Sequence, residues 1–464
     1  MKIFSRRSFI TKTSAVAAGA IIMPGLVRCG NSAPKSISAP KAITDRKVNV
    51  AVIGVGGQGR ASWNACTEEN VVALCDVSET AATRGFETFP DAKRYKDYRV
   101  MFDEMANQID AVFVATPDHN HFAAAMTAME LGKHICVEKP LAHNVWQLRT
   151  LRKAASHYNV FSQMGNQGHA TNGIRQVKEW YEAGILGDVR EVFAWFNGPA
   201  FFERGYFLKP ETYPPEGEPI PEGLDWDLWL GPAKFRPYSH FYVPRFWRGW
   251  YELGNGELGD WACHTLDAPF WSLDLGMPVS VDSVERTPSP EGKGFVSDSS
   301  VLKFEFVARG NKPPVTLNWF ENLKPENRPE WGLEELPGSG MIMVGDKVSL
   351  MTGGRPNDPK LLLPEEEWTK FTENMPEQTI PRVPEEAPQT EFLQAIKGEG
   401  PMPGSNFDYS TRLTEMAAIG VMAQRFDTRI EYDAENMKVT NHPDYDQFIK
   451  EPVRSGWEHG EDLW

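Results

Sequence analysis

The 464-residue chain has only five cysteines, and none of them stands at the paired spacing typical of a zinc site. They suggest no disulfide framework either. Three of them, Cys66, Cys75 and Cys136, fall in segments that we expect to be helices or strands, where cysteine is usually a small buried apolar residue. The histidines include no H-x-x-x-H pair. We therefore expect no metal site.

Positive charge is also scarce. Lysine and arginine number 48 against 63 aspartates and glutamates, a net charge of −15 that argues against nucleic acid, whose phosphates need a concentrated basic face. The apolar run from Ala15 to Val27 is too short for an ordinary membrane-spanning helix, so no stable membrane span is expected. With 41% hydrophobic residues, the chain should form two or three globular domains.

The N-terminus resembles a twin-arginine export signal. Arg6 and Arg7 stand in SRRSFITK before the apolar run, although Lys12 comes one position later than the lysine usual in that motif. We predict a leader over residues 1–33, a flexible linker over 34–47 and a periplasmic protein. Cys29 is a candidate lipidation site, but Arg28 departs from the small residue usual there. The alternative is a basic start followed by a disordered leader.

A glycine-rich loop follows the first predicted strand. Val50 to Ile53 is short and apolar, and the loop after it, VGGQG, completes a G-x-G-x-x-G spacing at Gly54, Gly56 and Gly59. In a dinucleotide site the first glycine permits a tight turn, the second lets the backbone approach a pyrophosphate, and the third allows close packing of the helix. Gly57 and Gln58 complete the expected phosphate loop. A glycine-rich turn without a ligand is the alternative.

An acidic residue at the right distance supports cofactor binding. A second apolar run, Val71 to Cys75, ends in Asp76, which lies 22 residues after Gly54. Its carboxylate can accept hydrogen bonds from a ribose and would repel a 2′-phosphate. Because the next residue is Val77 and not arginine, the sequence favours NAD over NADP.

Helices and strands are expected to alternate as far as residue 165. The expected helices are Glu79–Thr88, His119–Leu131 and Leu148–His157, and the further strands are Ala92–Tyr98, Ile109–Ala115, His134–Val137 and Val160–Met164. This order predicts a Rossmann domain over residues 48–165, with a parallel sheet covered on both faces. Ligands in such sheets bind at the carboxyl ends of the strands, so the glycine loop, Asp76, Thr116-Pro117 and Glu138-Lys139-Pro140 should converge.

The composition changes after Gly165. Segments of β type follow one another with few helices between them, which predicts an α/β domain over residues 166–426 with an open, mostly antiparallel sheet. They are Val189–Phe196, Pro278–Arg286, Ser299–Val307, Pro314–Trp319 and Met341–Leu350. A loop rich in aromatic residues spans Pro199–Trp250, helical periodicity returns at Thr390–Phe426, and residues 427–464 should form a tail packed on the body.

Three short stretches carry the candidate chemistry. Lys139 follows a buried strand, Asp260 and His264 stand four residues apart in GNGELGDWACH, and MGNQGH lies at the domain junction. If Asp260 lies on a helix, both side chains share a face. A histidine can accept a proton near neutral pH, and a lysine can stabilise a developing alkoxide. Taken alone, Asp260 and His264 would more often be an ordinary i, i+4 pair on a surface helix, and Lys139 could be a solvated residue after a strand.

The ordered set of glycine fingerprint, Glu138-Lys139-Pro140 and D-x-x-x-H resembles the glucose–fructose oxidoreductase, inositol dehydrogenase and rhizopine-catabolism (Gfo/Idh/MocA) family over nearly all of Val48–Phe426. The resemblance implies that Lys139 orients the reacting hydroxyl, that His264 is the acid/base, and that Asp260 holds the imidazole and binds substrate. Most members oxidise or reduce sugars and polyols with NAD(P), and many pair through their sheets, so we also expect a homo-oligomer.

The remaining candidate residues surround this set. We expect Thr116, Pro117 and His121 to shape the nicotinamide pocket, with Glu138 and Gln167 contacting the cofactor, although a helix N-cap would also explain Thr116. Asn166 and Trp261 are candidate substrate contacts. Structural hydrogen bonding is an equally good reading of Asn166 and Gln167.

The main functional hypothesis is an exported enzyme with tightly bound NAD that acts on a secondary hydroxyl of a sugar, glycoside or polyol, such as the 3-position of a glycoside. A rival is a glycoside hydrolase that uses NAD transiently, as the resembling α-N-acetylgalactosaminidases do. Those enzymes carry a Y-P-T-H-type stretch where this chain has Asp260 to His264, DWACH. A third hypothesis is a sugar sensor that has kept the fold and the nucleotide but does not catalyse.

Overall fold

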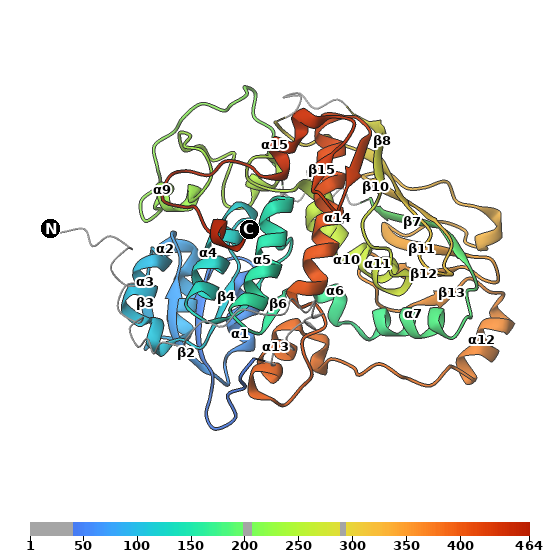
Figure 1. Ribbon diagram of the computed structural model, residues 1–464, viewed down its shortest axis with the longest axis horizontal. Helices are drawn as coiled ribbons and strands as arrows, with labels where there is room; N and C mark the ends of the chain where they lie inside the picture. The colour runs from blue at the N-terminus through green and yellow to red at the C-terminus, as the bar shows by residue number, and fades with distance from the viewer. Residues whose placement is uncertain (1–39, 198–206, 288–293) are drawn as a thin grey trace, which may run out of the picture. The chain divides into compact units, whose positions relative to one another are not determined.

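The computed structural model describes residues 40–197, 207–287 and 294–464, and residues 39–464 form one compact unit (Figure 1). The predicted leader, Cys29 and the first part of the linker lie outside the described residues. The same holds for residues 198–206 and 288–293, the first of which belong to the predicted aromatic loop. In the described part of the chain, no helix is both long and apolar enough to cross a membrane.

The N-terminal domain is built on a parallel six-stranded sheet of order β3-β2-β1-β4-β5-β6. The strands are β1 (Asn49–Ile53), β2 (Asn70–Cys75), β3 (Lys93–Tyr95), β4 (Ala111–Val114), β5 (His134–Val137) and β6 (Ser162–Met164). Every residue of β4 and β5 is buried, as expected of a parallel sheet covered on both faces. The predicted Rossmann fold is confirmed.

Helices connect these strands. They are α1 (Gly59–Ala65), α2 (Glu79–Thr88), α3 (Tyr98–Met105), α4 (Asp118–Glu130) and α5 (Val145–His157), and α6 (Gln167–Ala170) follows β6. The expected strand Ala92–Tyr98 was wrong at its end, because Tyr98 begins α3. The side chain of Asp97 accepts a hydrogen bond from the backbone N–H of Arg99 at 2.9 Å and starts that helix.

The larger sheet has nine strands in the order β13-β12-β11-β7-β10-β9-β8-β14-β15. They are β7 (Val189–Phe196), β8 (Ser280–Arg286), β9 (Ser300–Phe306), β10 (Val315–Glu321), β11 (Ser339–Gly345), β12 (Leu350–Gly353), β13 (Lys360–Leu361), β14 (Ile430–Asp433) and β15 (Lys438–Val439). Its pairs are antiparallel except β7 with β10, which run parallel, so the sheet is mixed.

Two expectations for this sheet need correction. The predicted single segment Met341–Leu350 is a hairpin, in which β11 pairs with β12 after a turn. At the end of β11 a Cβ on Gly345 would lie 2.3 Å from the carbonyl oxygen of Leu186, so the chain turns in close contact with its neighbour. The range 427–464 is also more than a tail, because β14 pairs with β8 and extends the sheet.

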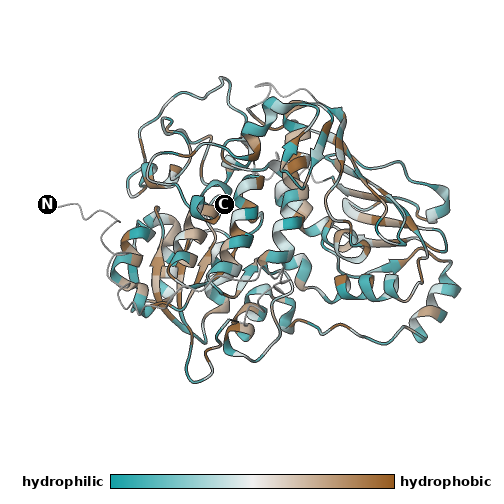
Figure 2. Cartoon of the chain, in the orientation of Figure 1, coloured by the Kyte–Doolittle hydropathy of each residue, from teal (hydrophilic) through white to brown (hydrophobic). Residues whose placement is uncertain are grey.

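Helices cover one face of the larger sheet and link it to the Rossmann domain. They include α7 (Asn172–Glu182), α10 (Gly256–Thr265), α11 (Asp267–Leu273) and α14 (Phe407–Phe426). Helix α14 contacts α5 on one side and α10, β8 and β9 on the other (Figure 1). Strands of both sheets carry hydrophobic residues where these layers meet (Figure 2). The remaining helices are α9 (Trp226–Leu230), α12 (Glu365–Glu373), α13 (Pro388–Lys397) and α15 (Asp446–Ile449).

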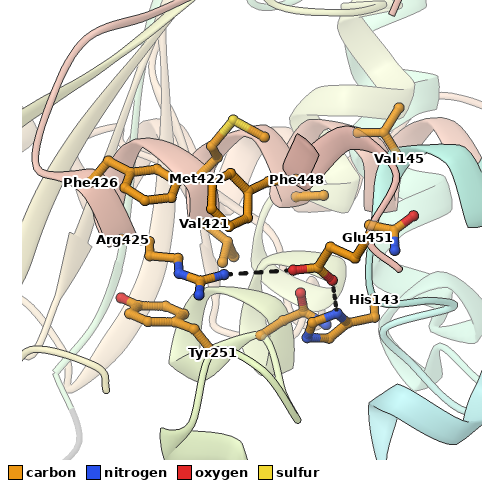
Figure 3. A pocket seen from close by; sticks show the side chains of 12 residues that line it. His143, Val145, Tyr251, Val421, Met422, Arg425, Phe426, Phe448 and Glu451 are labelled. Atoms are coloured by element: carbon orange, nitrogen blue, oxygen red, sulfur yellow. Dashed lines mark hydrogen bonds and ion pairs between the residues drawn. The ribbon is translucent and has the colours of Figure 1, made fainter. Parts of the chain in front are cut away.

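The C-terminal segment is attached to the Rossmann domain by aromatic and charged contacts. Trp464 stacks on Trp146 of α5 with ring centroids 6.1 Å apart. In a small pocket, His143 Nδ1 lies 2.8 Å from Glu451 Oε2, and the other oxygen of Glu451 lies 3.6 Å from an Arg425 guanidinium nitrogen (Figure 3). The segment is therefore clamped between α14 and the loop after β5.

The contact of Glu451 with His143 and Arg425, which we call the clamp, should depend on pH. Burial would lower the pKa of His143, but the charge and hydrogen bond of Glu451 outweigh it and raise that pKa above its ordinary 6.5. Burial likewise opposes ionisation of Glu451, yet His143 and Arg425 hold its pKa below 4.5. A raised histidine pKa stabilises the fold below 6.5 and loses that effect as pH rises through the raised value, whereas the glutamate contributes above 4.5.

We therefore expect the clamp to be strongest between about pH 4.5 and 6.5 and to weaken at higher pH. His143→Gln should lower the free energy of unfolding by roughly 1–3 kcal/mol near pH 5.5, with a smaller loss at pH 8. Denaturant unfolding across this range measures the difference. His157→Gln, at an exposed position of α5, is the control. An equal loss at both pH values would contradict a protonated clamp.

Candidate active site

In the glycine loop between β1 and α1, three of the glycines leave no room for a side chain. Gly54 has φ +83°, and a Cβ there would lie 2.6 Å from the carbonyl oxygen of Ala115. A Cβ on Gly59 would lie 1.8 Å from the carbonyl oxygen of Gly54. At Gly56 a Cβ would meet Ala81 Cβ of α2 at 2.8 Å, so packing also requires a glycine here, and its approach to a pyrophosphate stays a prediction. Gly57, at φ +51° with open space beside it, is the position that leaves room for a phosphate.

Asp76 at the end of β2 closes this loop. One carboxylate oxygen accepts hydrogen bonds from the backbone N–H groups of Val55 at 2.8 Å and Gly56 at 3.0 Å, and the other accepts from Ser78 at 2.9 Å. Burial raises the pKa of Asp76 against the lowering effect of these bonds. A carboxylate can accept about four hydrogen bonds, so Asp76 shapes the loop and still has capacity for a ribose hydroxyl.

The carboxyl ends of β4 and β5 lie beside this loop. The two ring nitrogens of His121 lie 2.7 Å from the Thr116 carbonyl oxygen and 2.8 Å from that of Pro140, so this buried histidine ties the two loops together. The N-cap of α4 is Pro117 and not Thr116.

Two buried polar atoms at these strand ends have no hydrogen-bond partner among the described residues, Thr116 Oγ1 and Glu138 Oε2. Burial raises the pKa of Glu138 to about 7, partly offset by Lys139 and by the Gln58 amide, 3.5 Å away. These unpartnered groups, together with the open glycine loop, fit a bound dinucleotide. In the part of the chain that the structure describes, no group of three or more His, Cys, Asp and Glu side chains could hold a metal ion.

Lys139 and Asp260 form an ion pair that joins the end of β5 to α10. Lys139 Nζ lies 2.6 Å from Asp260 Oδ1 and donates to the Asp260 backbone carbonyl at 3.0 Å. Arg248 Nε, from the aromatic loop, lies 3.4 Å from the same carboxylate oxygen. Burial opposes the ionisation of Asp260, but the two cations outweigh it and hold the pKa of Asp260 well below its usual range. The carboxylate is therefore charged when the site works.

His264 lies one turn after Asp260 on α10, but a different side chain holds its ring. We had expected Asp260 to hold the imidazole. In the structure His264 Nδ1 lies 2.7 Å from Asn166 Oδ1, and Asp260 is bound to Lys139 and Arg248 instead. The ring is 1% exposed. Burial, Lys139 and Arg355 lower the pKa of His264 well below 6.5 against the raising effect of Asp260, so the imidazole is neutral near pH 7.

The hydrogen bonds of Asn166 assign the tautomer of His264. Its amide nitrogen donates to the Cys263 carbonyl and to Asp267 Oδ2, the latter at 2.8 Å, so its oxygen must face the imidazole. An amide oxygen only accepts, so the short contact of 2.7 Å favours a proton on Nδ1 and a lone pair on Nε2, although the Gly168 N–H also lies 3.4 Å from Nδ1. Asn166 is fully buried, and these bonds occupy both ends of its amide. It therefore positions His264 and has no group left to reach a substrate.

Asp267 orients Asn166 by accepting a hydrogen bond from its amide nitrogen. Its carboxylate also contacts His169 Nδ1 at 3.0 Å and accepts a hydrogen bond from the Tyr409 hydroxyl. Four residues at the site were not among the predicted ones: Asp267, Tyr409, Arg248 and Arg355. Asp267 stands three residues after His264, a spacing that should have been considered, but no local pattern indicates the other three.

Two more predicted residues lie close by. Trp261, partly buried on α10, makes an edge contact with the His264 ring at 5.7 Å between centroids and stacks on Phe196 at 4.0 Å. Gln167 begins α6 and is partly exposed. The structure thus places Trp261 against His264 and Gln167 next to Asn166 at the start of α6.

Replacing Gly57 with alanine tests the loop as a phosphate site. The methyl group would enter the open space, and the positive φ costs about 1–2 kcal/mol of stability. We expect NAD affinity to fall at least about tenfold, measured by NADH fluorescence titration. Gly184→Ala has a similar φ of +73° and equally open surroundings in another part of the chain, and should leave the affinity unchanged. Equal affinities in both variants would place the phosphates elsewhere.

The tautomer of His264 can be read by NMR. In protein labelled with 15N-histidine, we expect Nδ1 of His264 to carry the proton, with the resonance assigned by its loss in His264→Gln. Asn166→Ala should yield a mixture of tautomers and lower kcat by roughly 100-fold, since a general base contributes at least that much. Asn172→Ala, an exposed asparagine six residues later, is the control. An unchanged tautomer in Asn166→Ala would refute this assignment.

Comparison with protein families agrees with this geometry. Residues 48–166 match the oxidoreductase family model with an NAD-binding Rossmann fold (GFO_IDH_MocA), and residues 171–290 match the C-terminal alpha/beta domain of the same family. Together the two matches take in more than half of the chain.

Relatives of known name share part of the sequence. An inositol 2-dehydrogenase/D-chiro-inositol 3-dehydrogenase of Lacticaseibacillus casei is 34% identical over 30% of this chain and 42% of its own length. A levoglucosan dehydrogenase of Pseudarthrobacter phenanthrenivorans is 25% identical over 59% and 63%. A glycosyl hydrolase family 109 protein of Phocaeicola vulgatus is 29% identical over 38% and 33%. The chain thus spans less than two thirds of the length of each.

Solved structures show the same fold over most of the chain. The WlbA dehydrogenase of Chromobacterium violaceum, in complex with NADH and UDP-GlcNAcA, superposes with a TM-score of 0.60 at 17% identity, covering 86% of this chain and 99% of that one. An inositol dehydrogenase homolog of Azotobacter vinelandii, with NADH and myo-inositol, gives 0.56 at 16% identity, covering 85% and 99%. The fold, the two family matches and the NAD-binding domain show that this chain belongs to the Gfo/Idh/MocA oxidoreductase family.

Proposed function

We propose that this protein is an NAD-dependent oxidoreductase that oxidises or reduces a secondary hydroxyl of a sugar, glycoside or polyol. The observation that carries the proposal is the cluster of Lys139, Asp260 and a neutral His264 next to the Rossmann domain. The names of the inositol and levoglucosan dehydrogenases among its relatives support this substrate class. Asp76 favours NAD over NADP, because a 2′-phosphate would meet its carboxylate.

His264, Lys139 and Asp260 would have different roles in the oxidation of an alcohol. NAD, when bound, accepts the hydride from the carbinol carbon. Nε2 of His264 has a free lone pair and takes the hydroxyl proton, and the Lys139 ammonium stabilises the negative charge that develops on the oxygen. Asp260 keeps Lys139 in place and offsets part of the positive charge around the imidazole. In the reverse direction His264 returns the proton to the alkoxide.

We further propose that the protein is exported with NAD already bound and that the same NAD is reoxidised by a second substrate. The twin-arginine-type N-terminus supports export in the folded state, and free NAD is scarce outside the cytoplasm. If the same NAD is reoxidised while it stays bound, the nucleotide should be released slowly. A preparation that loses NAD on dialysis and needs fresh NAD for each turnover would exclude it.

A second candidate is NAD-assisted glycoside cleavage, which the similarity to glycosyl hydrolase family 109 proteins favours. In such a reaction transient oxidation acidifies the neighbouring C–H bond, the aglycone leaves, water adds and the hydride returns. Release of free aglycone from an aryl glycoside without accumulation of NADH would identify this activity. A ketone product with stoichiometric NADH would identify the dehydrogenase.

The first experiment uses protein purified without added nucleotide. We expect denaturation to release near-stoichiometric NAD(H), and mixing with a panel of glycosides to give a single turnover of nicotinamide absorbance. Lys139→Met and His264→Ala should each slow this step by roughly 10²- to 10⁴-fold. The controls are Lys93→Met and His157→Ala at exposed positions. Full turnover in the Lys139 and His264 variants would show that the site lies elsewhere, and absence of nucleotide binding would refute the proposal.

A further inference from the structure

A short loop after β12 places a cation at the edge of the candidate active site. Residues 353–357 are held on two sides, because Thr265 Oγ1 of α10 donates to the Gly354 carbonyl at 2.7 Å and Thr171 Oγ1 donates to the Pro356 carbonyl at 3.0 Å. A Cβ added to Gly168 would lie 3.2 Å from both His264 Cα and Pro356 Cδ. The backbone of Arg355 is therefore fixed beside the catalytic histidine.

The Arg355 side chain is exposed and makes no hydrogen bond or ion pair with another described residue. Its guanidinium lies over the Trp261 ring at 5.6 Å from the centroid, and Trp261 in turn contacts His264. Its charge reaches the catalytic base, since Arg355 is one of the groups that lower the pKa of His264. The other guanidinium at the site, that of Arg248, already contacts Asp260.

An uncompensated cation at this place needs an explanation. The protein has a net charge of −15, so acidic side chains outnumber basic ones, yet no described carboxylate pairs with Arg355. A positive charge near a base disfavours the proton that the base must accept, so Arg355 works against the base when the site is empty. A negatively charged group on the substrate would pair with Arg355 and offset that effect during turnover.

We propose that Arg355 binds a carboxylate of the substrate, so that the enzyme acts on sugars of the uronic acid class in preference to neutral sugars. A planar guanidinium matches a carboxylate with two parallel hydrogen bonds, and that of Arg355 lies over the Trp261 ring, which itself contacts His264. The inference rests on the proposed dehydrogenase function and specifies its substrate class. Arg355 is a specificity-determining residue, while His264 and Lys139 carry the chemistry.

The test compares paired methyl pyranosides of the gluco, galacto and manno series, each as the neutral sugar, the uronic acid and the uncharged uronic methyl ester. In the NAD-loaded wild-type protein we expect at least one uronic acid to exceed its neutral and ester counterparts by roughly 30-fold or more in kcat/KM. Arg355→Gln should reduce kcat/KM for that acid by roughly 10- to 100-fold, whereas kcat/KM for the neutral sugar should not fall, because removing the cation relieves its opposition to protonation of His264. Arg190→Gln, an exposed arginine on β7, is the matched control.

Several outcomes would overturn the proposal. They are a wild-type preference for neutral sugars, an equal effect of Arg355→Gln on acids and neutral sugars, and a preference for sugar 6-phosphates over uronic acids. Calorimetry separates this inference from the proposed function. If uronic acids bind the wild type and not Arg355→Gln while no sugar reduces NAD, Arg355 is confirmed as the carboxylate site and the dehydrogenase proposal fails. If neutral sugars alone reduce NAD, the dehydrogenase proposal stands and the assignment of Arg355 as a carboxylate site fails.

Discussion

The ion pair between Lys139 and Asp260 is the contact on which the rest of the site depends. It joins the carboxyl end of β5 in the Rossmann domain to α10 under the larger sheet, at a distance of 2.6 Å. Both side chains are nearly buried, and buried charges are tolerated only when they are paired. Each partner comes from a different domain, so replacing one of them would leave the other charge nearly buried without this counterion. The pair therefore couples the Rossmann domain to the helix that carries His264.

Charge balance around this pair determines the state of His264. Burial, Lys139 and Arg355 favour the neutral imidazole, and Asp260 opposes them. Asn166 then selects which nitrogen is free, and Asp267 holds Asn166 through a carboxylate that also contacts His169 and Tyr409. Electrostatic effects thus set the protonation state of His264, and a chain of hydrogen bonds orients its ring.

Local patterns were sufficient for most helices and strands. Helix α2 and strands β5 and β7 have the predicted bounds, because caps and hydrophobic periodicity act within a few residues. The errors have local causes too. The strand predicted over Ala92–Tyr98 is too long because Asp97 is the N-cap of α3, and the single segment predicted over Met341–Leu350 contains a turn after Gly345 that separates β11 from β12. The spacing of Asp260 and His264 correctly placed both on α10, yet it could not say which partner each would choose.

The sequence by itself determined the glycine loop, the acid after β2, the order of elements and the identity of Lys139, Asp260 and His264 as candidates, since each depends on residues close in the chain. Only the tertiary structure decided that Asn166 and not Asp260 holds His264, that Asp76 closes the glycine loop, and that Arg248 and Arg355 lie at the site. Asn166 and His264 are 98 residues apart, and Lys139 and Asp260 are 121 apart. Contacts over such distances follow from how the two sheets and α14 pack together, which no local rule specifies.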